Sequence, residues 1–249
     1  MSAPRVLVVE HEKGTGPGQF GERLAAQGLD LDLCRPWDGD RVPREPGRYD
    51  GLLVLGGSMG PYDVDRAPWL PAVCRLLRAA AGRDLPTLGI CLGMELLTVA
   101  CGGKVRHAEH PEVGLCELTP LLPASRDELF AFLTESDTPP CAVQWHWEET
   151  SVPPEGAVPL LTSARCTHQA YRIGTSVWGV QFHPEVLAGD IATWGTSDTG
   201  PLQALGLDPD AVVGHVAREE QRLRTLWGGL AERWGTVVSA RRRRRDGAE

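Results

Sequence analysis

The residues with the clearest chemical potential lie around Cys91, which sits between Gly89 and Gly93. A short apolar run from Thr87 to Ile90 precedes this cysteine, and an apolar-periodic segment from Leu92 to Ala100 follows it. This pattern predicts a strand, a sharp turn and a helix, the arrangement of a nucleophile elbow with Cys in place of Ser. The N–H groups at the start of that helix favour a thiolate, so Cys91 is predicted to be a nucleophile.

A base and a carboxylate follow a second apolar run, Trp178 to Phe182. His183 ends the predicted strand, Pro184 stops it, and Glu185 comes two residues after the histidine. A thiol, an imidazole and a carboxylate that orients the imidazole are the parts of an activated cysteine nucleophile. The alternative is that Cys91 is a small buried hydrophobe, like most cysteines, and that His183 is structural.

The elements that would position these groups alternate along the first hundred residues. Strands are predicted at 6–9, 29–34, 52–55 and 87–90, and helices at 18–27, 71–81 and 92–100. This order predicts an α/β fold with a doubly wound, mostly parallel sheet and helices on both faces. Shorter runs at 113–118 and 142–147, with proline-rich turns between them, predict antiparallel strands added to the same sheet.

The C-terminal part of the chain has a different pattern. Apolar residues such as Trp194, Leu223 and Trp234 recur near helical spacing, which predicts helices that pack on the preceding domain; a docking face for a partner is the alternative. The arginines from 241 to 245 predict a basic, solvated tail. The expected division is therefore a catalytic domain at 1–190, a helical extension at 191–240 and a disordered tail at 241–249.

Composition narrows the class of protein. A length of 249 residues, with 42% hydrophobic and 23% charged residues, suits one α/β domain with a large core. The net charge of −8 argues against nucleic acid and anionic membranes as partners. Seven cysteines, an odd number, together with a start that lacks a signal-peptide pattern and the absence of a long apolar run, favour a cytoplasmic protein without a transmembrane helix.

Four segments resemble the class I glutamine amidotransferase family, and most closely its GMP-synthase type. They are the elbow at 89–94, the strand end at 179–185, the strand and glycine-rich loop at 49–58, and the run at 169–174. The resemblance covers about residues 5 to 188. It implies a flavodoxin-like three-layer fold and a Cys-His-Glu triad of Cys91, His183 and Glu185.

The resemblance also implies a reaction. Cys91 would attack a γ-glutamyl amide to give a glutamyl thioester, with the oxyanion held by the N–H groups of Gly57 and Leu92. No metal or organic cofactor is expected. His146 and Trp147, in an alternating aromatic and ionisable segment, are candidates for the substrate pocket.

One position departs from the family pattern, because Glu95 stands where the family usually has Gln. A carboxylate at this position would favour a nearby ammonium group and repel a carboxylate. The departure therefore bears on the identity of the substrate rather than on the hydrolytic chemistry.

Three functions remain open at this point. The first is an amidotransferase that passes ammonia from glutamine to a separate synthetase, since no synthetase domain follows in this sequence. The second is a stand-alone γ-glutamyl hydrolase or peptidase acting on a small metabolite. The presence of Glu95 slightly favours this second function. The third is a catalytically silent regulatory or binding subunit, against which the intact triad argues.

Two further motifs have structural interpretations. The glycine-rich segment at 14–18 lacks the spacing of a phosphate-binding loop. The histidines His107 and His110, near Glu109 and Glu112, are expected to lie in a loop rather than to bind a metal, because no matching cluster of ligands occurs elsewhere.

Overall fold

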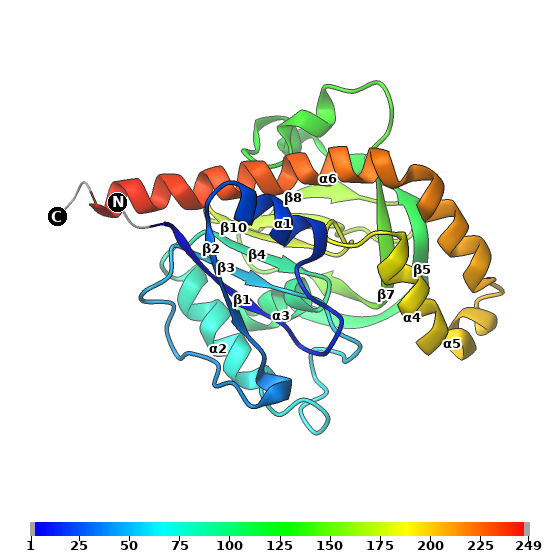
Figure 1. Ribbon diagram of the computed structural model, residues 1–249, viewed down its shortest axis with the longest axis horizontal. Helices are drawn as coiled ribbons and strands as arrows, with labels where there is room; N and C mark the ends of the chain where they lie inside the picture. The colour runs from blue at the N-terminus through cyan, green and yellow to red at the C-terminus, as the bar shows by residue number, and fades with distance from the viewer. Residues whose placement is uncertain (1–2, 247–249) are drawn as a thin grey trace.

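The central layer of the computed structural model is an eight-stranded sheet with the order β2-β1-β3-β4-β10-β9-β8-β6, and the structure describes residues 3–246 (Figure 1). The five strands from β2 to β10 run parallel, and β9, β8 and β6 continue the sheet antiparallel. The prediction of a doubly wound, mostly parallel α/β fold is confirmed. The strands of this sheet are β1 (Arg5–Val9), β2 (Asp30–Cys34), β3 (Gly51–Val54), β4 (Thr87–Ile90), β6 (Thr119–Pro120), β8 (Val158–Thr162), β9 (Ala170–Ile173) and β10 (Val177–Val180).

Helices cover both faces of this sheet (Figure 1). The inward residues of β1 show the division: Val6 and Val8 belong to one hydrophobic cluster, and Leu7 and Val9 belong to the other. Helices α1 (Gly18–Ala26) and α6 (Pro209–Asp246) contribute to the first cluster, while α2 (Leu70–Ala81) and α3 (Leu92–Ala100) contribute to the second. Because both faces are buried, β3 and β4 have four buried residues each and no polar alternation.

The strands expected to extend the main sheet at 113–118 and 142–147 instead form a sheet of their own. Among the strands within residues 3–246, β5 (Lys104–Glu117) and β7 (Cys141–Val152) pair with each other alone, in antiparallel register. The physical reason is that β7 meets the chain just beyond the end of β10, and both edges of β10 are already paired, with β4 and β9. β7 reaches the main sheet through a bridge from Val143 to His183. The histidines expected in a loop, His107 and His110, lie within β5.

The C-terminal part is helical, in α4 (Ala188–Ser197), α5 (Thr199–Ala204) and α6. Two tryptophans of α6 are buried, with Trp227 4.6 Å from the ring of Phe182 and Trp234 6.2 Å from the ring of Phe20. The arginine run expected in a separate tail lies in the last turns of α6, where Arg245 Nη1 is 3.1 Å from the buried carboxylate of Asp50. Residues 247–249 of that expected tail lie outside the described residues, and the division into domains stays a prediction.

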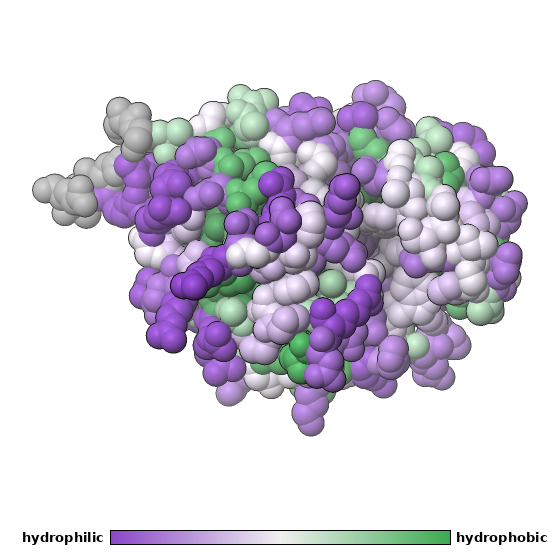
Figure 2. Space-filling model, turned by 60° about the horizontal axis from the view of Figure 1, so that its bottom comes forward, coloured by the Kyte–Doolittle hydropathy of each residue, from purple (hydrophilic) through white to green (hydrophobic). Residues whose placement is uncertain are grey.

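Among residues 3–246 there are also three short 3-10 helices, η1 (Pro36–Asp38), η2 (Leu122–Arg126) and η3 (Ala131–Thr134). Hydrophilic residues cover much of the face in Figure 2, with small hydrophobic areas between them. None of the helices within residues 3–246 combines the length and apolar character needed to span a membrane.

Candidate active site

Cys91 occupies the sharp turn between β4 and α3, as the sequence predicted. Its backbone has φ 50° and ψ −110°, a conformation that side-chain-bearing residues rarely adopt. A hydrogen bond of 2.8 Å from the Cys91 N–H to the Val180 carbonyl ties this turn to β10. The strained backbone therefore fixes the sulfur at the carboxyl end of the sheet, between two neighbouring parallel strands.

The glycines on either side of Cys91 are required by close backbone contact. A Cβ atom on Gly93 would lie 2.1 Å from the carbonyl oxygen of Val54, and one on Gly89 would lie 2.5 Å from the carbonyl oxygen of Gly93. Neither position has room for a side chain, since backbone atoms do not move aside as a flexible side chain does. The glycine bracket thus lets α3 begin directly against β3.

His183 and Glu185 form a buried pair beyond the end of β10. His183 Nδ1 donates to Glu185 Oε1 at 2.8 Å, and both residues are less than 5% exposed. The His183 N–H also donates to the Val143 carbonyl at 2.9 Å, which anchors the histidine to β7. Within residues 3–246, His183 Nε2 is buried without a hydrogen-bond partner, so this nitrogen is free to exchange a proton with another group.

A contact that sequence reasoning missed holds this pair in place. The start of α1 lies against the His-Pro-Glu segment, where Gln19 donates from its backbone N–H to the Glu185 carbonyl at 3.0 Å and from Nε2 to the Pro184 carbonyl at 2.9 Å. Gly18 has φ 45°, and a Cβ atom there would lie 2.2 Å from the Glu185 carbonyl oxygen. The end of the glycine-rich segment at 14–18 therefore positions the His-Pro-Glu segment. In the sequence, the only hint of this role is the glycine at the start of the predicted helix.

Cys91, His183 and Glu185 line one cavity of about 600 Å³. Gly56 marks the point where the thiol and the imidazole come together, since a Cβ atom on it would lie 3.6 Å from Cys91 Cβ and 3.0 Å from His183 Cε1. The structure thus brings together three residues that are 94 positions apart at most in the chain. The arrangement can place a nucleophilic sulfur, a proton-accepting ring and an orienting carboxylate around one bound molecule.

The surroundings of the Cys91 thiol oppose the effect that the sequence predicted from the helix. Burial raises the pKa of Cys91 well above its usual range, and the nearby carboxyl groups of Glu95 and Glu185 raise it further. The N–H of Leu92 at the start of α3 lowers this pKa, as expected for a helix N-terminus, but it is the smaller effect. The sequence suggested a thiolate from the helix alone, whereas burial and the neighbouring carboxyl groups favour the thiol form of Cys91, which then needs a base to become a nucleophile.

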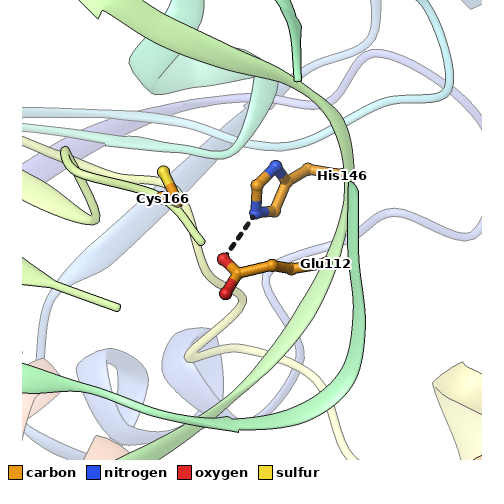
Figure 3. A group of neighbouring side chains, drawn as sticks. All are labelled: Glu112, His146 and Cys166. Atoms are coloured by element: carbon orange, nitrogen blue, oxygen red, sulfur yellow. Dashed lines mark hydrogen bonds and ion pairs between the residues drawn. The ribbon is translucent and has the colours of Figure 1, made fainter. Parts of the chain in front are cut away.

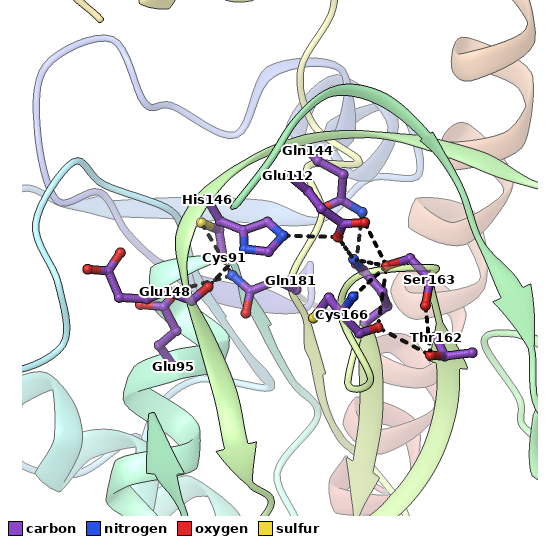
Figure 4. Close-up of polar contacts among 11 residues, drawn as sticks. Cys91, Glu95, Glu112, Gln144, His146, Glu148, Thr162, Ser163, Cys166 and Gln181 are labelled. Carbon is purple, nitrogen blue, oxygen red and sulfur yellow. Dashed lines mark hydrogen bonds and ion pairs between the residues drawn. The ribbon is translucent and has the colours of Figure 1, made fainter. Parts of the chain in front are cut away.

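Glu95 lies one turn beyond Cys91 on α3 and is 2% exposed. Gln181 Nε2 donates to Glu95 Oε1 at 3.0 Å and lies 3.8 Å from the Cys91 sulfur, so Gln181 joins the two residues (Figure 4). Burial raises the pKa of Glu95 to about 8, and the carboxyl group of Glu148 contributes to the increase. At neutral pH Glu95 is therefore mostly a neutral acid, which resembles the amide expected at this position more than a carboxylate does.

His146 belongs to the cavity wall, and its ring takes part in a hydrogen-bonded network that includes Glu112 (Figures 3 and 4). Its Nδ1 is 2.8 Å from the Glu148 carbonyl, and its Nε2 is 3.4 Å from Glu112 Oε2. This ring is therefore engaged with Glu148 and Glu112, whereas His183 shares with Cys91 the close contact around Gly56.

Glu112, His146 and Cys166 offer possible metal ligands within 4.8 Å of one another. Both oxygens of Glu112 already accept hydrogen bonds, from Ser163 at 2.8 Å and from Gln169 at 2.6 Å. A metal would have to displace these donors, so the cluster acts as a polar support for β7.

The other residues implied by the resemblance are also close to the cavity. Gly57 and Trp147 lie on its wall, and Leu92 is buried beside Gly57, because a Cβ atom on this glycine would lie 3.1 Å from Leu92 Cδ2. The Leu92 N–H lies close enough to the Cys91 sulfur to lower the pKa of this thiol, and its role as an oxyanion donor stays a prediction.

The outer wall of the cavity comes from a region that the sequence assigned to packing. Trp194 of α4 lies with its ring 4.9 Å from the His183 ring and 5.8 Å from the Trp145 ring. Trp145 donates from Nε1 to Asp198 Oδ2 at 2.8 Å, and its ring lies 6.5 Å from that of Trp147. Helical spacing alone did not reveal this role, because a half-buried tryptophan at the edge of an apolar stripe looks the same whether it packs or lines a cavity.

Comparison with known proteins gives a consistent result. Residues 22–193 match the family described as glutamine amidotransferase class-I. The chain is 28% identical to γ-glutamyl peptidase 3 of Arabidopsis thaliana over 67% of this chain and 65% of that protein, slightly under two thirds of its length. It is 31% identical to a glutamine-hydrolyzing GMP synthase subunit of Natronomonas pharaonis over 73% of this chain and 88% of that protein. The crystal structure of a glutamine amidotransferase from Methylobacillus flagellatus superposes with a TM-score of 0.82 and 27% identity, covering 95% of this chain and 96% of that one.

Proposed function

The chain belongs to the class-I glutamine amidotransferase family, and from this premise we propose that it hydrolyses a γ-glutamyl amide bond through a glutamyl thioester on Cys91. The observation that carries the proposal is the meeting of the Cys91 elbow and the His183–Glu185 pair at Gly56, on the wall of one cavity. Family membership supports the class of reaction, and this geometry supports the assignment of roles to individual residues.

The first half of the reaction forms the thioester. His183 Nε2 takes the proton of the neutral Cys91 thiol as the sulfur attacks the γ-carbonyl carbon of the substrate. The oxyanion is held by the N–H groups of Gly57 and Leu92, and one such donor is typically worth about 3–4 kcal/mol of the barrier. The C–N bond then breaks, and His183 gives its proton to the departing nitrogen, which leaves as ammonia or an amine.

The second half regenerates the enzyme. His183 removes a proton from a water molecule, the resulting hydroxyl group attacks the thioester carbon, and the C–S bond breaks to release glutamate. The cysteine sulfur recovers its proton from His183. Glu185 accepts a hydrogen bond from Nδ1 throughout, which fixes the ring and stabilises its charged form.

Replacement of the nucleophile tests this proposal. Cys91→Ala should abolish release of ammonia or amine, because a methyl group forms no thioester, while circular dichroism and melting temperature stay close to the native values. A γ-glutamyl electrophile should label Cys91 in the native protein, as peptide mass spectrometry can show. Cys101→Ala, at a half-buried cysteine outside the cavity wall, is the matched control. Turnover that persists in Cys91→Ala would overturn the proposal.

The fate of the released nitrogen separates two versions of this function. A cavity of about 600 Å³ is in the range that accommodates drug-sized ligands, larger than a single amino acid requires. This volume favours a γ-glutamyl hydrolase acting on a substituted amide, the activity suggested by the name of the Arabidopsis relative. The alternative, delivery of ammonia to a separate synthetase, takes its support from the GMP synthase relative of Natronomonas pharaonis. Assays of free glutamine with and without candidate synthetases distinguish them, since delivery requires faster glutamine hydrolysis when the synthetase is present.

A further inference from the structure

Four rings form a continuous wall that begins at the proposed base. His183 contacts Trp194 edge to face at 4.9 Å, Trp194 contacts Trp145 at 5.8 Å, and Trp145 contacts Trp147 at 6.5 Å. All four residues line the same cavity, although they come from β7, α4 and the segment after β10. Ammonia, the leaving group of free glutamine, is far too small to contact all of these rings.

The order of the rings indicates whether they face the amine end or the glutamyl end of a bound substrate. His183 protonates the departing nitrogen, so this nitrogen lies beside the imidazole in the reactive complex. Because Trp194 packs against that imidazole, any substituent on the nitrogen leads along Trp194 toward Trp145. The glutamyl end lies instead toward Glu95 of α3, which Gln181 links to Cys91.

An acidic side chain lies beside Trp145, the third ring of this aromatic wall. Asp198, at the junction of α4 and α5, accepts from Trp145 Nε1 through Oδ2, and residues 3–246 provide no ion pair or hydrogen bond to its Oδ1. Arg66, a basic residue on the cavity wall, does not pair with Asp198. It donates to Ser58, and Ser58 in turn donates to Glu12. Lys13 adjoins Glu12 in the chain. The aromatic wall therefore combines π faces with an acid that has no basic partner in the described part of the chain.

We propose that Trp194, Trp145 and Asp198 form a subsite for the leaving group, and that it takes an aliphatic amine carrying a second positive charge, such as a diamine. The indole faces attract the distal ammonium group by cation–π interaction, and Asp198 accepts a hydrogen bond from it. The inference rests on the proposed hydrolysis, because that reaction orients the substrate, and it adds the class of amine that is released.

Three γ-glutamyl amides of similar length test the subsite. The amide of diaminobutane carries a distal cation, that of pentylamine is neutral, and that of aminobutyrate carries a distal carboxylate. We expect kcat/KM for the diaminobutane amide to exceed that for the pentylamine amide by about tenfold, with the aminobutyrate amide slowest. Equal values within a factor of about two across the three would overturn the inference.

Variants assign the preference to named residues. Asp198→Asn should reduce the ratio of kcat/KM for the diaminobutane and pentylamine amides several-fold, and Asp210→Asn, the same charge change at an exposed site of α6, should leave the ratio unchanged. Trp194→Phe should retain most of the ratio, because a ring remains, and Trp194→Ala should lose it. An identical ratio in Asp198→Asn and Asp210→Asn would remove Asp198 from the subsite.

A binding measurement separates failure of the subsite from failure of the reaction. Calorimetry on the Cys91→Ala protein should rank the three amides in the same order by Kd. If no amide is hydrolysed by the native protein but this ranking appears, the proposed function fails, and the three residues bind the distal cation without forming a leaving-group subsite. If all three amides are hydrolysed and bind equally, the subsite fails and the proposed function stands.

Discussion

The floor and the outer wall of the cavity are built in different ways. The floor, with Cys91 and His183, is formed where strands end and is held by backbone hydrogen bonds to Val180 and Val143. The outer wall, with Trp194 and Asp198, is carried by side chains of α4 and its junction with α5, and both residues are only partly buried. If the proposed function and subsite hold, backbone geometry fixes the chemistry, while the choice of amine depends on side chains that can change without moving Cys91.

The largest test of this contrast removes the charge that orients the base. Glu185→Gln should lower kcat about a thousandfold, because the amide neither holds the Nδ1–H tautomer firmly nor stabilises the imidazolium. KM should change much less, since Glu185 acts through His183. Glu128→Gln, an identical change at an exposed position, is the control in the same steady-state assay. A kcat within about threefold of the native value would contradict this prediction, because catalysis at the floor would then not depend on the His183–Glu185 pair.

A second test concerns the backbone contact beneath the nucleophile. Gly93→Ala should reduce the free energy of unfolding by about 3 kcal/mol or prevent folding, since its Cβ atom would lie 2.1 Å from the Val54 carbonyl oxygen. Gly200→Ala, in α5 near the outer wall, has no atom of the described residues within 4 Å of its Cβ position and should be neutral or slightly stabilising. Urea unfolding measures both. Equal stability of the two variants would show that the floor tolerates change as readily as the wall.

The sequence predicted the floor because its signals are local. Glycines at positions 89 and 93, an apolar strand before Cys91 and a helix after it specify the elbow within about ten residues. Alternation of strands and helices predicted the doubly wound sheet for the same reason. The pairing of His183 with Glu185 required only a strand end and a spacing of two residues.

The parts that sequence reasoning missed depend on contacts between distant segments. Trp194 and Trp145 meet across 49 positions, and Gln19 reaches Pro184 across 165. Periodicity identifies which face of a helix is apolar, but it does not say whether that face meets a core or a cavity. The separate pairing of β5 with β7 was missed similarly, because the edges of β10 are filled by strands whose order the sequence does not state.

Glu95 lies beneath the nucleophile, and its ionisation offers a smaller test of the floor. The pKa of this carboxyl is raised to about 8 in the folded protein from an unfolded value near 4.5. A raised carboxyl pKa means that the unfolded chain releases this proton first, so stability falls as pH rises above the unfolded pKa. We expect the native protein to lose about 2 kcal/mol relative to Glu95→Gln between about pH 4 and pH 6, measured by urea unfolding. Parallel stability profiles for the two proteins would show that Glu95 ionises as freely as an exposed residue.

The smallest expected effect concerns the glutamyl end of the substrate. It tests whether Glu95, in the floor, affects this end alone and not the amine end at the wall. Above the raised pKa of about 8, Glu95 is a carboxylate and should weaken binding of a substrate that carries its own α-carboxylate. Glu95→Gln should therefore raise kcat/KM for glutamine relative to glutaminamide by about fivefold at alkaline pH, and by less at neutral pH, where Glu95 is mostly protonated. The ratio between amides of pentylamine and diaminobutane should stay the same in this variant, because their glutamyl ends are identical. If Glu95→Gln changed the ratio for the pentylamine and diaminobutane amides but not the ratio for glutamine and glutaminamide, Glu95 would lie on the leaving-group side of the cavity. The proposed division, in which the floor holds glutamate and the wall selects the amine, would then be wrong.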